Sequence, residues 1–194
     1  MTNNAAYTWQ AAVQETVDAT LNRTVSSGIT GASYYEGFFA NIRRSPASGE
    51  YVAVSSRGNF YMTWAPGDTF WMPHNRPANR RVQNMGWTPD ARLWITSRGG
   101  ELSVNRDPGI AETFEPSKLG SRGFGLLDVG FRSQQEGYAC GGSGTLFYTS
   151  DGGRTWRRER AADNIPGNLY LVKFVTQDQG FILGNNKILL RYIA

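Results

Sequence analysis

The run NMGWTPDARLWITSRGGELSV extends from Asn84 to Val104 and contains three short apolar segments separated by two turns. These segments are rich in aromatic and β-branched residues, which favour strands. Gly99 stands in the second turn, and glycine tolerates the positive φ that short hairpins need. This order of features predicts three consecutive antiparallel strands.

The same order of features occurs four times along the chain. The equivalent positions in the first strand of each copy are 43, 44 and 43 residues apart by subtraction, at Arg44, Trp87, Phe131 and Phe174. A period of this length is typical of β-propellers, in which each repeat forms one blade. We therefore expect an all-β chain with four β-propeller blades, each a four-stranded antiparallel sheet.

The repeat also predicts how the chain is divided. We expect residues 1–194 to form part of a propeller, with an outer strand of a preceding blade (1–16), an inserted connection (17–37), three blades (38–75, 76–118 and 119–162) and a last blade without its outer strand (163–194). Such complementary ends could pair within one ring, which removes exposed edges. Pairing between two chains, as a homodimer or by exchange of blades, is the alternative.

The third copy continues into Ser150-Asp-Gly-Gly-Arg-Thr-Trp156, which matches the Asp-box hairpin of sialidase-like propellers. Asp151 is expected to hydrogen-bond backbone amides of its own turn, and Trp156 to pack between blades. This motif indicates the fold and says little about function. Its structural residues are Ser150, Asp151, Gly153, Thr155 and Trp156.

Side chains that catalysis and metal binding often use are scarce in this sequence. Cys140 is the single cysteine and His74 the single histidine. One cysteine excludes an intrachain disulfide and a cysteine-based zinc site, and one histidine leaves little for His-based catalysis. We therefore expect no catalytic residue, no metal and no cofactor.

Apolar runs in the chain are short. The run Gly180–Gly184 is far below the roughly 20 residues that span a bilayer, so no stable membrane insertion is expected. The first residues lack the basic start and apolar run of a secretory signal, so they do not indicate a compartment.

Arginine carries most of the positive charge. The net charge is +4, and only three of the 20 cations are lysines. The planar guanidinium suits carboxylates and aromatic rings and is preferred over lysine at interfaces. Eight arginines and three acids lie between residues 43 and 98. This excess predicts a positive patch that binds an anionic partner.

Blade topology places most of these cations on one face, because the turns between second and third strands and the connections between blades emerge together. By this rule Arg57 and Arg98 lie on such turns, while His74, Arg76, Arg80 and Arg81 lie on an interblade connection. We expect two further arginines near the start of an innermost strand, closer to the channel. The predicted partner-binding residues are Arg43, Arg44, Arg57, His74, Arg76, Arg80, Arg81 and Arg98.

Several stretches resemble the photosystem II stability and assembly factor family. The most specific are Gly49–Gly58 and Gln179–Gly184, and others include Pro73–Arg76, Arg80–Arg81 and the Asp-box. The resemblance implies a seven-bladed propeller of the thylakoid lumen with an arginine-rich patch on its face. At the observed period, this chain would supply only the four carboxy-terminal blades.

The resemblance also implies partners and a role. They are a newly made photosystem II reaction-centre subunit, its precursor with a carboxy-terminal extension, and other photosystem II assembly intermediates. We therefore expect a non-enzymatic assembly and repair factor that binds this subunit through the arginine-rich face, in the lumen and in association with the thylakoid membrane.

Two other functions are weighed against this one. The Asp-box, and arginines able to clamp a sugar carboxylate, would suit a sialidase-like glycosidase fragment, but the acids that such a site needs cluster poorly. The basic, arginine- and aromatic-rich composition would suit a generic nucleic-acid- or protein-binding propeller. We expect no nucleic-acid partner.

Overall fold

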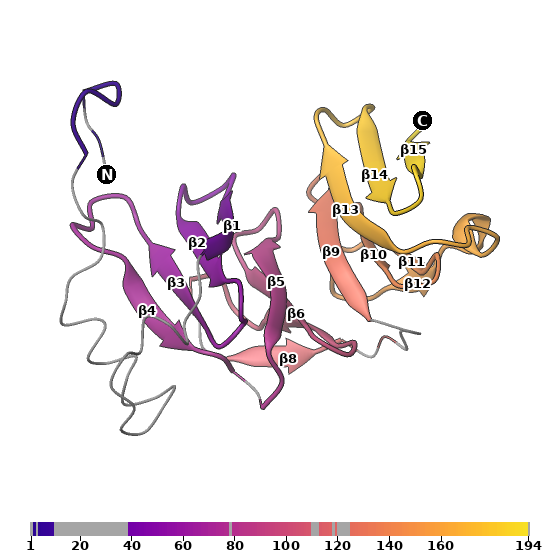
Figure 1. Cartoon of the computed structure of the whole chain (residues 1–194), viewed down its shortest axis with the longest axis horizontal. Helices are drawn as coiled ribbons and strands as arrows, with labels where there is room; N and C mark the ends of the chain where they lie inside the picture. Colours follow the sequence, from indigo (N-terminus) through magenta and orange to yellow (C-terminus); the bar gives the residue numbers. More distant parts are fainter. Residues whose placement is uncertain are drawn as a thin grey trace.

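The computed structural model describes residues 2, 4–9, 39–77, 79–109, 113–117, 119 and 125–193. In these residues the regular elements are strands, apart from the short 3-10 helix η1 (Arg160–Ala162). The strands form four antiparallel sheets in chain order, and Figure 1 shows these sheets following one another along an arc. The prediction of an all-β propeller with four antiparallel blades is confirmed.

Each sheet is one blade, in which the strands keep their order in the chain. Three blades have four strands in the structure and the last has three. Each sheet lies inside one of the four ranges that the repeat delimits, but where the blade boundaries fall between sheets stays a prediction. The strands of the four blades are, in turn, β1 (Phe39–Arg44), β2 (Tyr51–Ser55), β3 (Phe60–Trp64) and β4 (Met72–Asn75); β5 (Val82–Trp87), β6 (Leu93–Ser97), β7 (Leu102–Asn105) and β8 (Phe114–Pro116); β9 (Leu126–Phe131), β10 (Gly137–Gly141), β11 (Leu146–Thr149) and β12 (Arg157–Arg158); and β13 (Leu169–Phe174), β14 (Gly180–Gly184) and β15 (Leu189–Arg191).

Most of two predicted segments at the amino end lies outside the described residues. Of the outer strand expected at 1–16, the structure describes only residues 2 and 4–9, and residues 4–8 form turns and bends. The inserted connection expected at 17–37 lies outside the described residues.

The second strand of each of the first three blades is buried on both faces. In β2, β6 and β10, four of the five residues are buried, whereas β14 has two of five. A strand that is covered on both faces reads as a continuous apolar run rather than an alternating one. The blades therefore stack face to face, and the last blade is covered less than the others.

Hydrophobic clusters fill the spaces between neighbouring blades. Each cluster joins strands of one blade to the first strands of the next, so that burial of apolar surface stabilises the stack. The three clusters group Val52 with Met85, Trp94 with Val129, and Cys140 with Leu169.

The innermost strands β1, β5, β9 and β13 are joined by a chain of polar contacts. Asn41 Nδ2 donates to Asn84 Oδ1 (2.6 Å), and Asn84 Nδ2 donates to Asp128 Oδ1 (2.9 Å). The backbone N–H of Val172 donates to Asp128 Oδ2 (2.9 Å). Asp128 is fully buried, and burial raises its pKa, although the charge of Arg43 acts in the opposite direction. One carboxylate thus contacts the innermost strands of all the other blades.

Candidate partner-binding surface

Four of the predicted arginines lie together where the first two blades adjoin. Arg57 is in the turn between β2 and β3, and Arg98 is in the turn between β6 and β7. Arg80 and Arg81 are in the connection from β4 to β5. The backbone N–H of Arg98 donates to the carbonyl of Arg81 (2.8 Å), so turn and connection lie side by side.

Two of these guanidinium groups hold the neighbouring turns in place. Arg98 Nη2 donates to the carbonyl of Ser56 (3.0 Å), and Arg80 Nη1 donates to the carbonyl of Gly99 (3.0 Å). Each of these contacts uses one of the five N–H donors of a guanidinium. Both groups are therefore oriented by the protein and still have donors for a carboxylate.

The surface that these arginines form is positive. Arg76, Arg80, Arg81 and Arg98 are exposed, and none of them forms an ion pair with a carboxylate of the described residues. Unbalanced charge of one sign costs self-repulsion, and it steers and holds partners of the opposite sign. Arg76 begins the β4–β5 connection that also holds Arg80 and Arg81. We call Arg57, Arg76, Arg80, Arg81 and Arg98 the arginine face.

His74 lies elsewhere than the sequence predicts. It is part of strand β4 and pairs with Tyr61 of β3, rather than lying on the interblade connection. Its ring stacks on Tyr61 with centroids 4.8 Å apart, and its Nε2 hydrogen-bonds Thr63 Oγ1 (2.7 Å). The prediction is wrong because β4 extends to Asn75, which puts His74 inside the sheet. Its role in partner binding stays a prediction.

The predicted positions of Arg43 and Arg44 are also wrong. The sequence puts them near the start of an innermost strand, but they are the last residues of β1, at the opposite end of the sheet from the turn that holds Arg57. Arg43 Nη2 forms an ion pair with Asp128 (2.6 Å), and its guanidinium lies 5.2 Å from the ring centroid of Trp94. Arg43 therefore stabilises the blade stack, and both residues lie away from the arginine face.

Arg44 lines a groove at the ends of the innermost strands. The groove has a volume of about 470 Å³, and Trp87, Phe131, Phe174 and Lys173 also line it. Lys173 is absent from the set of partner-binding residues that the sequence predicts. The positions that define the 43-residue period are the signal that could have located this groove, because equivalent residues of successive blades surround the same axis.

The Asp-box hairpin connects β11 to β12. Asp151 Oδ1 accepts hydrogen bonds from the Thr155 backbone N–H (2.8 Å) and from Thr149 Oγ1 (2.8 Å), and its Oδ2 accepts from Thr155 Oγ1. Burial raises the pKa of Asp151, but these hydrogen bonds together lower it below the ordinary value. Both carboxylate oxygens are used inside the turn.

Other residues of the motif shape the turn and anchor it. Gly153 has a φ of +88°, and its carbonyl accepts a hydrogen bond from Trp156 Nε1 (3.1 Å). The Trp156 ring packs against the cluster that contains Trp94 and Phe147, which come from different blades. Ser150 is exposed.

Other candidate chemistry is limited in the described residues. Among them, no group of three or more His, Cys, Asp and Glu side chains lies close enough together to hold a metal ion. Cys140 is buried, and burial raises the pKa of its thiol. No helix in the same residues has the length and apolarity for a membrane span.

Comparison with known proteins connects this chain to a family. A family model described as "Photosynthesis system II assembly factor YCF48" matches residues 1–193. The photosystem II stability/assembly factor HCF136 of Arabidopsis thaliana, which is named chloroplastic, is 59% identical over 194 residues, 100% of this chain and 48% of that relative. This chain spans about half the length of the curated relatives that it matches.

Solved structures agree with the sequence comparison. YCF48 from Cyanidioschyzon merolae matches with a TM-score of 0.77 and 41% identity, over 98% of this chain and 61% of that one. A structure described as YCF48 bound to D1 peptide matches with a TM-score of 0.69 and 44% identity, over 81% of this chain and 52% of that one. The family model covers almost every residue, and the chain therefore belongs to the photosystem II assembly factor family.

Proposed function

We propose that this protein is a non-enzymatic photosystem II assembly and repair factor, which binds a newly synthesised reaction-centre subunit or its precursor through the arginine face. The names of its relatives and the relative bound to a D1 peptide support this role. The observation that carries the proposal is the arginine face, whose exposed members lack carboxylate partners in the described residues. Acidic side chains or a free carboxylate of the partner would fit these guanidinium groups.

The proposed place of action is the thylakoid lumen, in association with the thylakoid membrane. The chloroplastic relative from Arabidopsis thaliana supports this location. Other photosystem II assembly intermediates are the further partners that we propose, because a factor that holds one subunit must release it to the next stage of assembly.

A charge-reversed variant tests the proposal. The triple variant Arg76→Glu, Arg80→Glu and Arg81→Glu should lose at least tenfold in affinity for peptides that tile the D1 precursor. The matched control reverses three exposed cations of the last two blades, Arg157, Arg160 and Arg191. Fluorescence anisotropy at two salt concentrations measures both effects, and binding by the unchanged protein should weaken as salt rises.

Two results would contradict this role. Equal affinity of the unchanged protein and the Arg76/Arg80/Arg81 variant would show that the arginine face does not bind the peptide. An equal loss in the control variant would mean that net charge, rather than this face, determines affinity. A single-stranded oligonucleotide of the same length serves as a competitor, and its displacement of the peptide would favour the nucleic-acid-binding alternative.

We also propose that isolated chains associate with one another, by pairing or by exchange of blades. The first blade exposes Phe39 (48%), Ile42 (58%) and Met72 (60%), and Phe39 and Ile42 line an apolar groove of about 490 Å³. At the other end of the arc, β15 pairs only with β14 among the described strands, so its other edge could pair with a strand of a second copy. Light scattering should give a mass above that of one chain, lowered by Ile42→Asp, and a monomer mass at all concentrations would contradict this.

A further inference from the structure

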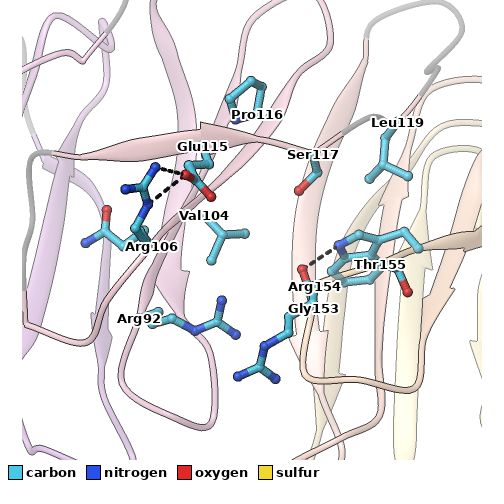
Figure 2. Close-up of a pocket in the computed structure, with 12 residues that line it drawn as sticks. Arg92, Val104, Arg106, Glu115, Pro116, Ser117, Leu119, Gly153, Arg154 and Thr155 are labelled. Carbon is cyan, nitrogen blue, oxygen red and sulfur yellow. Dashed lines mark hydrogen bonds and ion pairs between the residues drawn. The ribbon is translucent and has the colours of Figure 1, made fainter.

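A pocket of about 540 Å³ lies between the second and third blades, on the side where the Asp-box turn emerges. Figure 2 shows Arg106 and Glu115 at one side of this pocket, and Arg92 and Arg154 at another. The turns that contribute to it, β5–β6, β7–β8 and β11–β12, emerge at the opposite ends of the sheets from the turns that carry Arg57 and Arg98. The pocket is therefore separate from the arginine face.

One of the arginines that line the pocket is buried and fixed. Arg92 is 6% exposed, its Nε donates to Asp90 Oδ2 (2.8 Å), and its Nη2 donates to the carbonyl of Gly152 (2.9 Å). The bond to Gly152 joins the second blade to the Asp-box turn of the third. Arg92 is thus fixed before any ligand arrives, and Asp90 balances its charge.

Arg154 is the cation best placed to bind a ligand. Its side chain is 63% exposed, and its Nη1 donates to the carbonyl of Asp151 (3.0 Å), which orients the guanidinium. Its Nη2 lies 3.7 Å from Asp90 Oδ2, beyond hydrogen-bonding distance, and that oxygen already accepts from Arg92. A ligand carboxylate could therefore hydrogen-bond Arg154 without breaking a close ion pair.

The remaining lining is mixed in character. Three arginines of the described residues line the pocket beside a single carboxylate, Glu115, which is paired with Arg106. Val104, Leu119 and Trp156 form an apolar wall. A bare anion would leave this wall in contact with water, whereas a ligand with both a carboxylate and an apolar group would cover it.

We propose that this pocket is a second binding site, which takes a short peptide segment that carries a carboxylate beside an apolar side chain. The volume lies within the roughly 300–1,000 Å³ of typical ligand sites, which is enough for two or three residues. Arg154 binds the carboxylate, and the apolar side chain packs on Leu119 and Trp156. Arg106 and Arg92 hold Glu115 and Asp90 in ion pairs, so that neither acid repels the ligand. The arginine face and this pocket can be occupied at the same time.

An array of amide-capped tetrapeptides tests the site. The array pairs Asp or Glu with Leu, Val, Phe or Trp in both orders, and each peptide has an isostere with Asn or Gln in place of the acid. At low ionic strength, fluorescence anisotropy should detect binding of acidic peptides and at least tenfold weaker binding of their isosteres. Arg154→Gln and Arg106→Gln should each weaken the acidic peptides by about tenfold, while Arg160→Gln, an exposed arginine outside the pocket, should not.

The variant with Arg76, Arg80 and Arg81 changed to Glu should keep full affinity for these tetrapeptides, which separates this site from the proposed function. The proposal is overturned if no acidic peptide binds more tightly than its isostere, or if both Arg154→Gln and Arg106→Gln bind like the unchanged protein. Displacement of the peptides by inorganic phosphate at equal concentration would also overturn it, in favour of a small-anion site.

Discussion

At the residue scale, Asp151 stabilises the Asp-box turn in its ionised form. Burial raises its pKa, but the hydrogen bonds from Thr155 and Thr149 lower it overall. A pKa that is lower in the folded state gives stability that is present above the ordinary value of 3.8 and lost as pH falls through the folded pKa. We expect Asp151→Asn to cost about 1 kcal/mol at neutral pH and progressively less below pH 3.8.

Urea unfolding of the unchanged protein and of this variant, from pH 7 downwards, measures the difference in their free energies of unfolding. Ser150→Ala changes an exposed neighbour in the same motif and should leave stability unchanged. If the cost of Asp151→Asn stayed constant as pH fell, the ionised carboxylate would not be the stabilising group.

The sequence predicts the contacts of a residue correctly where its partners are close to it in the chain. The partners of Asp151 lie within four residues of it, so the Asp-box hairpin contains them all. Arg43 differs, because its ion-pair partner Asp128 is 85 residues away and no local sequence pattern predicts this ion pair. His74 is misplaced for a related reason, since its burial depends on how far β4 pairs with β3.

At the element scale, the β2–β3 turn packs directly on the start of the second blade. Gly58 has a φ of +69°, and a Cβ there would lie 2.1 Å from the carbonyl oxygen of Val82. The Val82 N–H also donates to the Gly58 carbonyl (2.9 Å). We expect Gly58→Ala to destabilise the protein by about 3 kcal/mol, from the positive φ together with the clash.

Gly109→Ala is the matched control for this turn. Gly109 has a φ of +76°, and a Cβ there would meet nothing within 4 Å, so only the cost of the backbone conformation, about 1 kcal/mol, should appear. Thermal unfolding compares the two variants, and equal destabilisation would show that the interblade contact is unimportant. Glycine in a turn is predictable from sequence, but the neighbouring blade that requires it at position 58 is not.

At the scale of the whole molecule, the regular period predicts the order and stacking of the blades. Each repeat can bury its apolar faces only against its neighbours, so a 43-residue period in a sequence of strands leads to a row of blades around an axis. The pocket between the second and third blades is not predictable in this way. Its arginines, Arg92, Arg106 and Arg154, come from three different turns, and only the packing of two blades brings them together.

The polar chain along the innermost strands makes the blades depend on one another. Asp128 contacts Arg43 of β1, Asn84 of β5 and the Val172 N–H of β13. We expect Asp128→Ala to cost about 3–5 kcal/mol, because Arg43 loses its carboxylate and two donors lose their acceptor. Asp163→Ala, which removes a partly exposed ion pair with Arg158, should cost at most about 1 kcal/mol.

Hydrogen exchange distinguishes a loss shared by all blades from a local one. In Asp128→Ala the amides of β1, β5 and β13 should lose protection together, because one carboxylate bonds groups on all three strands. In Asp163→Ala any loss should stay near η1. Reduced protection confined to β9 in Asp128→Ala would mean that the blades are held by their hydrophobic clusters alone, and that the polar chain does not couple them.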